Sequence, residues 1–412
     1  MKNRVYISLF LSVTVACSQD YDLNLLFDES ASDVVSDVVA TDSSNAPVTS
    51  DVPISMALTL YEPPAIDLTK VLYPDQIYDH LTKSTIGQDD AMKGMATFIH
   101  DHLINFPFRV AVQFNPKFSQ YSDVENDKKN ILMIGPTGTG KTSTIQALSK
   151  IMNVPMAVGN ATEWTSQGYI GSKWQHMFDM LYINAELFLK AQGKKPKSSE
   201  IIACAERGVV FIDEIDKLCF HDGDLDVVSR VQKELLSPIQ GAVITLNNGE
   251  VLDTRNILFI AGGAFPNLKP GNGKAFIPHD LERFGMVPEL AGRLQNIVQL
   301  QSLSKDNLKQ IMTTSKSSVL RQLIIKYKVV YNIDLSFSDG VLDYIAEIAA
   351  LQSTGARSLN SMISDVMKDI TFYIRNYVGK PLEIKRQYAT KFLEKYRPKK
   401  EEVNPSILGM YS

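Results

Sequence analysis

Cysteine is scarce in this chain: 412 residues contain only Cys17, Cys204 and Cys219. The three lie far apart and form no C-x-x-C pair, which argues against a disulfide framework and against a zinc site. We therefore expect no bound zinc. Cys204 and Cys219 are predicted to be small buried hydrophobic side chains, because free cysteine is among the most buried residue types.

An excess of basic charge is also lacking. The 42 Lys and Arg are balanced by 46 Asp and Glu, which gives a net charge of -4. Sequence-independent binding to nucleic acid requires a strongly basic face. We therefore expect no nucleic acid partner.

The apolar run at the N-terminus is too short to span a membrane as a helix. Residues 5–16 are mainly apolar, follow a basic start and end at Cys17, which is the pattern of a signal peptide. Ala16 and Ser18 around this cysteine resemble the lipobox of bacterial lipoproteins, although Thr14 stands where Leu or Val is usual. The alternatives are a misassigned start codon and an apolar N-terminus that targets nothing.

Length and composition allow two or three globular domains, because 44% of the residues are hydrophobic. Residues 27–55 are mainly Asp, Ser, Val, Thr and Ala without a helical or strand period, which indicates a disordered acidic linker. The predicted divisions are a signal-like segment (1–17), an acidic Ser/Asp-rich linker (18–62), a large domain (63–302), a small helical domain (303–395) and a tail (396–412).

Hydrophobic periodicity predicts an α/β fold. Continuous apolar runs suited to a parallel sheet covered on both faces occupy residues 130–134, 208–212 and 256–260. A helical pattern that starts near Pro74 includes Ile77, Leu81 and Ile86. Apolar residues at helical spacing also occupy 308–312, 341–349 and 362–373. The predicted fold class is α/β: a P-loop domain with a parallel sheet, followed by a small helical domain.

The strongest chemical motif is GPTGTGKT, residues 135–142, directly after the first predicted strand. Its glycines let backbone N–H groups point at phosphate oxygens, Lys141 contacts the β- and γ-phosphates, and the Thr142 hydroxyl joins a Mg²⁺ shell. ATP and Mg²⁺ are the expected cofactors. The predicted phosphate-binding residues are Gly135, Pro136, Thr137, Gly138, Thr139, Gly140, Lys141, Thr142 and Ser143.

A second motif, VVFIDEID at residues 209–216, is an apolar strand that ends in paired acids. Asp213 is predicted to hold Mg²⁺ through water, and Glu214 to polarise the attacking water as general base. The alternative is a solvated acidic strand end. Paired acids favour hydrolysis of ATP, and the chain has no N-K-x-D motif of the kind that a GTPase uses to read its base.

Six motifs in order resemble the Clp/HslU clade of AAA+ ATPases, the protein-unfolding subunits of compartmental proteases. Besides the P-loop they are IGQDDAMKGM (86–95), FIDEIDKL (211–218), NILFIAGGAF (256–265), RFGMVPELAGRL (283–294) and STGARSL (353–359). The resemblance covers residues 73–377. It implies an AAA+ large domain and a small helical domain, with ATP bound between them and at the subunit boundaries of a homohexameric ring.

The resemblance also assigns residues outside the P-loop. Ile86 and Gly87 would lie near the adenine, Arg293 would be an arginine finger that reaches a neighbour's γ-phosphate, and Arg357 would be the sensor-2 arginine. The alternative for each arginine is a surface salt bridge. A pore loop that grips unfolded polypeptide would hold Gly168, Tyr169, Ile170 and Gly171; the alternative for this tyrosine is a packed core side chain.

The chain departs from the clade at several places. Only residues 172–208 separate the GYIG motif from the acidic strand, which excludes the inserted domain of HslU. No cysteine-rich zinc domain and no I-G-F-type peptidase-docking tripeptide is found. A second pore loop is expected near residues 226–232, where the sequence DVVSRVQ lacks a glycine, and GGAF at 262–265 supplies no sensor-1 hydroxyl or amide.

The predicted function is therefore ATP-driven unfolding or remodelling of proteins, with unfolded polypeptides as substrates and a peptidase ring as a further partner. The alternative is a nucleotide-dependent scaffold or switch that threads nothing. The last residues, Met410, Tyr411 and Ser412, fit the hydrophobic-Tyr-any tail of ATPases that dock into a peptidase. The AAA+ body implies an ATP-containing compartment such as the cytoplasm, whereas the N-terminus resembles an export signal, so both localisations stay open.

Overall fold

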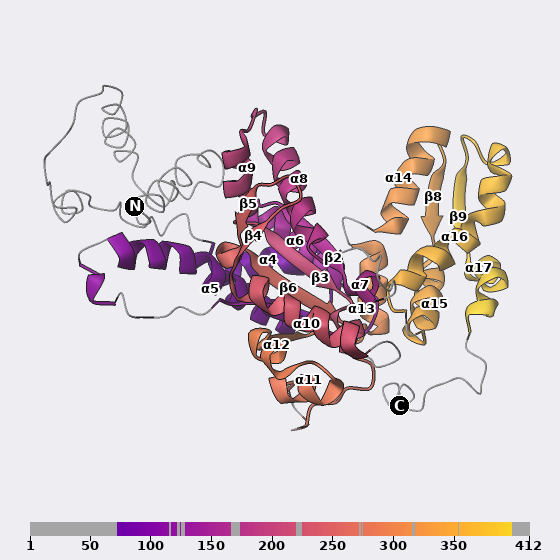
Figure 1. Ribbon diagram of the computed structural model, residues 1–412. Coiled ribbons are helices and arrows are strands. Elements are labelled where there is room, and N and C mark those ends of the chain that lie inside the picture. The colour runs from indigo at the N-terminus through magenta and orange to yellow at the C-terminus, as the bar shows by residue number, and fades with distance from the viewer. Residues whose placement is uncertain are drawn as a thin grey trace, which may run out of the picture.

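The computed structural model contains a large α/β domain and a small, mainly helical domain, which lie side by side (Figure 1). It describes residues 72–114, 117–121, 124, 128–165, 174–219, 225–271, 273, 275–314, 318–352 and 354–397. The signal-like segment, the acidic linker, the GYIG loop and the last residues of the tail lie outside the described residues. No helix within the described ranges is long and apolar enough to cross a membrane.

A five-stranded parallel sheet forms the centre of the large domain, with strand order β2-β3-β6-β1-β7. The strands are β1 (Ile131–Ile134), β2 (Met156–Asn160), β3 (Val209–Asp213), β6 (Leu258–Gly263) and β7 (Asn296–Gln299). The three predicted strands are β1, β3 and β6, which occupy the centre of the sheet. Every residue of β1 and β6 is buried, as their apolar sequences predict.

Alternate residues of each strand enter two different cores. Leu132 and Ile134 of β1 pack on one face of the sheet, and Ile131 and Met133 pack on the other. This alternation follows from the two-residue period of a strand. The sheet is thus the middle layer of three, with α8 to α12 on the first face and α4 to α6 on the second (Figure 1).

The helices of the large domain complete these layers. They are α4 (Pro74–Thr82), α5 (Asp89–Phe114), α6 (Lys141–Met152), α7 (Ala161–Thr165), α8 (His176–Ala191), α9 (Ser198–Ala205), α10 (Leu225–Gln240), α11 (Pro278–Phe284) and α12 (Pro288–Arg293). A small antiparallel pair, β4 (Val243–Thr245) and β5 (Val251–Asp253), and three short 3-10 helices, η4 (Ser119–Tyr121), η5 (Ile215–Cys219) and η6 (Thr254–Asn256), join them.

The small domain has its own hydrophobic core, built by five helices and one pair of parallel strands. Its elements are α13 (Lys305–Thr313), α14 (Val319–Tyr331), β8 (Asp334–Phe337), α15 (Asp339–Ala350), α16 (Arg357–Phe372), η7 (Ile374–Asn376), β9 (Pro381–Ile384), α17 (Arg386–Leu393) and η8 (Glu394–Tyr396). The predicted fold class is confirmed, and β8 and β9 are additions that the helical pattern did not predict.

Two local predictions were wrong. Ile86 lies in the turn between α4 and α5 rather than in a helix. Residues 226–232, where a second pore loop was expected, lie in α10. Gln232 explains this placement, because its buried amide donates to the carbonyl oxygens of Leu218 (2.7 Å) and Gly285 (3.2 Å) and accepts from the Val287 N–H (2.7 Å). Such a side chain fixes a core helix and does not face an open channel.

Candidate nucleotide-hydrolysis site

The predicted phosphate-binding loop connects β1 to α6 at the carboxyl edge of the sheet. Gly138 has φ +80° and Gly140 has φ +106°, values that disfavour any residue with a Cβ atom. Gly140 is the N-cap of α6, so the free N–H groups of the first helical turn face the loop. This arrangement suits an anion at the start of α6.

Lys141 folds back onto the loop that precedes it. Its Nζ donates to the carbonyl oxygens of Gly135 (2.6 Å) and Pro136 (3.0 Å), and the Thr139 hydroxyl also donates to Pro136 (2.8 Å). Burial lowers the pKa of Lys141, while the nearby Asp213 and Asp216 raise it. A phosphate would offer this ammonium a stronger, charged partner than two carbonyl oxygens.

The paired acids lie where β3 ends. Asp213 is the last residue of β3, and its Oδ1 accepts the N–H of Glu214 at 2.9 Å. Glu214 has φ +56°, an uncommon conformation for a residue with a side chain, and it turns the chain sharply out of the strand. Burial raises the pKa of Asp213, and the hydrogen bond from Glu214 together with the charge of Lys141 lowers it.

Thr162 is a site residue that the sequence did not reveal. Its hydroxyl donates to Glu214 Oε2 at 2.5 Å. The contact follows from strand register: Asn160 pairs with Asp213, so the residues just beyond the ends of β2 and β3 meet. The side chain of Asn160 accepts the N–H of Thr162 at 3.0 Å and fixes this turn. The contact between Thr162 and Glu214 could have been predicted from the sequence only if β2 had been predicted.

Asp216 is the second side chain that sequence reasoning missed. It is 1% exposed, its Oδ1 accepts the Ala264 N–H at 3.2 Å, and its buried Oδ2 has no hydrogen-bond partner among the described residues. The GGAF segment passes directly beside it. A Cβ on Gly262 would lie 2.8 Å from the Phe211 ring, which explains why this position supplies no sensor-1 side chain.

The small domain contacts the phosphate-binding loop directly. The Ala356 N–H donates to the Gly138 oxygen at 3.3 Å, and a Cβ on Gly138 would lie 2.1 Å from the Thr354 oxygen. Arg357, the first residue of α16, is exposed, and its charge acts on both Lys141 and Asp213. The segment that the family resemblance predicts as sensor 2 is therefore placed beside the phosphate site.

Of the predicted adenine-side residues, Ile86 and Gly87, the glycine lies against the small domain. Gly87 has φ +72°, and a Cβ there would lie 2.4 Å from the side chain of Asn307 in α13. Thr85 just before them shares a hydrogen bond of 2.8 Å with Thr144 of α6. The two domains thus meet on both sides of the phosphate-binding loop.

Arg293 is not part of this cluster. It is the last residue of α12 and is exposed. The charges of Asp213, Asp216, Arg357 and Glu214 act on Lys141, and no hydrogen bond or ion pair among the described residues joins Arg293 to any of these residues. The structure therefore brings together the predicted loop, acids and sensor-2 arginine, and leaves Arg293 outside the group.

The donor set fits ATP and Mg²⁺. Backbone N–H groups at the start of α6 and one ammonium suit a polyphosphate, and the Thr142 hydroxyl with the Asp213 carboxylate supplies the oxygen ligands that Mg²⁺ prefers. Thr142 and Asp213 would hold the ion, which would neutralise charge on the phosphates.

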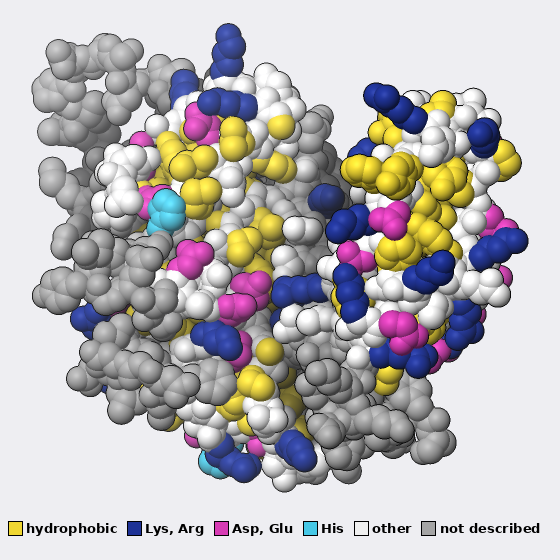
Figure 2. Space-filling model, turned by 90° about the vertical axis from the view of Figure 1, so that its right-hand side faces the viewer, with side chains coloured by type: hydrophobic (Ala, Val, Ile, Leu, Met, Phe, Trp, Pro, Cys, Tyr) yellow, Lys and Arg dark blue, Asp and Glu magenta, His cyan; other side chains and the backbone are white. Residues whose placement is uncertain are grey.

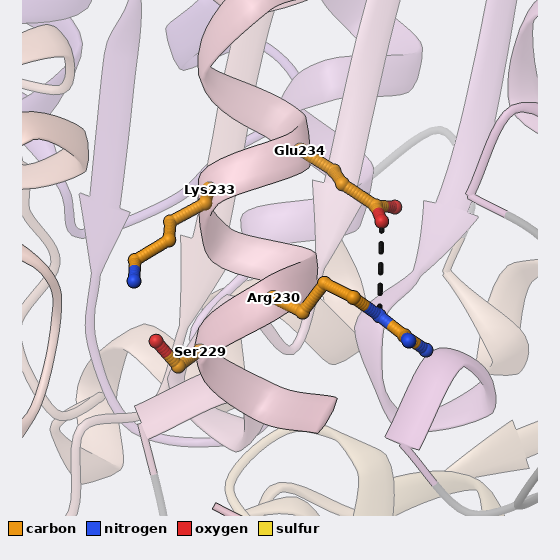
Figure 3. A pocket seen from close by; sticks show the side chains of 4 residues that line it. All are labelled: Ser229, Arg230, Lys233 and Glu234. Atoms are coloured by element: carbon orange, nitrogen blue, oxygen red, sulfur yellow. Dashed lines mark ion pairs between the residues drawn. The ribbon is translucent and has the colours of Figure 1, made fainter. Parts of the chain in front are cut away.

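A separate cavity of about 400 Å³ lies on α10 and is lined by Ser229, Arg230, Lys233 and Glu234 (Figure 3). None of the phosphate-binding residues lines it. Glu234 forms an ion pair with Arg230 (3.7 Å) and accepts the indole N–H of Trp174 (2.6 Å), which lies three residues after the GYIG motif. Trp174, the first described residue after the motif, is thus bonded to α10.

Two family models match the chain. The model of the AAA domain (Cdc48 subfamily) matches residues 126–297, and the model of the C-terminal, D2-small domain, of ClpB protein matches residues 303–372. These ranges contain the phosphate-binding loop and the sensor-2 segment respectively.

Curated relatives extend the similarity over most of the chain. The sequence is 31% identical to the ATP-dependent Clp protease ATP-binding subunit ClpX of Bacteroides thetaiotaomicron over 371 residues, 80% of this chain and 84% of that protein. It is 33% identical to ClpX of Borrelia duttonii over 340 residues, 73% of this chain and 74% of that protein. For ClpX of Azotobacter vinelandii the identity is 32% over 343 residues, 73% of each chain.

Proposed function

This chain belongs to the ClpX family of AAA+ ATPases, and from this premise we propose that it uses ATP hydrolysis to unfold proteins for a compartmental protease. The observation that carries the proposal is one site that joins Lys141, Asp213, Glu214 and Arg357. A nucleotide-dependent scaffold would need ATP binding alone. The carboxylate of Glu214, oriented by Thr162, is suited to activate water for hydrolysis. It therefore favours an ATP-hydrolysing enzyme over a scaffold.

Each residue has a distinct task in the hydrolysis. The P-loop N–H groups and Lys141 hold the phosphates, and Glu214 takes a proton from the attacking water. Thr162 keeps that carboxylate in place. Arg357 reaches the same phosphates from the small domain, so hydrolysis and release of phosphate change what holds the two domains together. Mg²⁺, when bound, supplies positive charge that stabilises the transferred phosphoryl group.

Substrate unfolding is assigned to the GYIG loop. Tyr169, with Ile170, grips an unfolded polypeptide by shape, and movement of the large domain pulls it. The contact from Trp174 to Glu234 supports this assignment, since it joins the chain three residues after the motif to a helix packed in the core of the domain. A peptidase ring is the further partner, with residues 410–412 as the predicted dock.

We assign the working form to a ring of identical copies, six as in the Clp/HslU clade. Both domains expose apolar side chains on the face shown in Figure 2. In the small domain Val329 and Phe372 are each 78% exposed, and in the large domain Leu187 is 57% and Val243 63% exposed. Apolar surface that remains exposed on both domains is suited to contacts between copies. ATP use places this ring in an ATP-containing compartment, and mass spectrometry of the mature N-terminus tests whether the signal-like segment is cleaved.

The decisive test is unfolding of a folded, tagged model protein by the full chain with ATP. We expect unfolding by the native chain, ATP binding without turnover by Glu214→Gln, and loss of binding by Lys141→Ala. Loss of a general base costs about 10²- to 10⁴-fold in rate. Tyr169→Ala is expected to hydrolyse ATP without unfolding the substrate. ATP hydrolysis without unfolding by the native chain would contradict the proposal.

A further inference from the structure

The linker between the two domains runs along the nucleotide site. The Leu300 N–H donates to the Ile134 oxygen at 2.7 Å, at the end of β1. Leu300 also packs on Gly135, where an added Cβ would lie 2.8 Å from the Leu300 Cβ. The linker therefore starts against the first residue of the phosphate-binding loop. A displacement of that loop would directly displace Leu300.

The next linker residue is held by one side chain. Gln301 donates its backbone N–H to Gln88 Oε1 at 2.8 Å, and Gln88 Nε2 donates to the Gln301 oxygen at 2.8 Å. A single amide thus satisfies both polar backbone groups of the linker residue, as a neighbouring strand would. Gln88 is 2% exposed, so water does not replace these bonds without cost.

The helix that follows the linker meets the same segment from the other side. Asn307 of α13 lies against Gly87, next to Gln88 in sequence. Its position is fixed by a reciprocal cap, in which the Asn307 N–H donates to Ser304 Oγ (3.1 Å) and the Ser304 N–H donates to Asn307 Oδ1 (3.1 Å). Residues 87–88 are therefore clamped between the linker and α13.

We propose that Gln88 is a positioning residue that couples the base side of the ATP site to the orientation of the small domain. Its amide nitrogen and its amide oxygen both bond to Gln301, so we expect it to act through the linker and not on the nucleotide. Adenine bound beside Ile86 and Gly87 displaces residues 86–88. Because Gln88 is hydrogen-bonded to Gln301, the linker moves with this segment, and α13, which follows the linker, changes its orientation. The proposal rests on the proposed function only in that it needs a bound nucleotide.

The test measures the angle between the domains. Spin labels at Lys150→Cys on α6 and Lys326→Cys on α14, both exposed positions, report the interdomain distance with and without a non-hydrolysed ATP analogue. Labelled full-length chains carry Cys17→Ser, because Cys204 and Cys219 are buried, and are diluted into unlabelled chains. We expect a nucleotide-dependent distance change in the native background and its loss in Gln88→Met, a side chain of similar length without donor or acceptor.

Two comparisons separate coupling from other roles. Gln310→Met, an exposed glutamine on α13, is the matched control and should behave as the native chain. Affinity for the analogue should fall by less than about tenfold in Gln88→Met, because no direct contact with the nucleotide is removed. Asn307→Ala removes the side chain of α13 that lies against Gly87. Asn307 is not buried, and its substitution should reduce the distance change.

Three results would overturn the proposal. The first is a distance change in Gln88→Met and Asn307→Ala equal to that of the control. The second is a native chain whose domains do not move on nucleotide binding. The third is a drop in affinity of more than about tenfold in a folded Gln88→Met, the size expected for a lost hydrogen bond to a charged ligand. A chain that moves on binding but unfolds nothing would contradict the proposed function and leave this coupling intact.

Discussion

A single hydroxyl, that of Thr162, holds the predicted general base. We expect Thr162→Val, which keeps the shape and removes the donor to Glu214, to lower kcat while KM for ATP stays near the native value. The expected loss is about tenfold, smaller than the 10²-fold or more that follows loss of the base, because the carboxylate remains but is less well oriented. Steady-state ATPase assays measure both constants.

Thr162→Ser is the control for this prediction, since it restores a hydroxyl at the same position and should recover most of the rate. An equal loss in both variants would show that the hydroxyl alone does not sustain the rate, and would contradict a role limited to the hydrogen bond to Glu214. A rise in rate in Thr162→Val would show that the bond restrains the base.

The residues that the sequence predicted are those that act within one contiguous motif. Lys141 and Thr142 follow a glycine-rich turn, and Asp213 and Glu214 end one strand, so local spacing suffices to identify their roles. Thr162 acts on a residue 52 positions away. The contact depends on the register between β2 and β3, and no local pattern reports that register.

Among the elements, the junction of α9 with β5 contains a carboxylate that should make stability depend on pH. Glu206, the C-cap of α9, accepts the Asp253 N–H of β5 at 2.9 Å. Burial raises the pKa of Glu206 to about 7 from 4.5; the hydrogen bond from Asp253 and the charges of Arg207 and Arg255 oppose the rise, and the Asp253 charge adds to it. The folded state therefore favours the protonated acid.

The sign follows from the raised pKa. The contribution of Glu206 to stability is fully present below pH 4.5 and is lost as the pH rises through 7. We expect Glu206→Gln to raise the melting temperature relative to the native chain at pH 8 and to give a smaller gain at pH 5. Thermal unfolding at both pH values measures the difference. The exposed Glu347→Gln is the control, and an equal shift for Glu206→Gln at both pH values would contradict the prediction.

The two strands of the central sheet that the sequence missed lie at its edges. β2 and β7 are its two outer strands, and β1, β3 and β6, which were predicted, are the inner three. Inner strands are covered on both faces and show continuous apolar runs. β2 is partly exposed, with Val158 49% exposed, and β7 begins with Asn296 and ends with Gln299, so neither has such a run.

At the scale of the whole molecule, we expect that one copy of the chain does not complete the proposed site. Arg293 is exposed at the end of α12, and no hydrogen bond or ion pair among the described residues joins it to Lys141 or to the paired acids. An arginine that stabilises charge on the γ-phosphate must reach it. We therefore expect Arg293 to act on the site of the next copy in the ring, which makes a closed, head-to-tail assembly a condition for hydrolysis.

Mixed assemblies test this arrangement. Arg293→Ala and Glu214→Gln chains should each be nearly inactive, but a copy with Arg293→Ala that receives the arginine of a Glu214→Gln neighbour has a complete site. Random mixing in equal amounts completes about a quarter of the junctions, so the ATPase rate should reach up to about that fraction of the native rate. Arg321→Ala, which removes an exposed arginine of α14, should remain active alone. If mixtures of assembled variants stay inactive while this control hydrolyses ATP, Arg293 does not serve a neighbouring site, and the exposed arginine has only a local role.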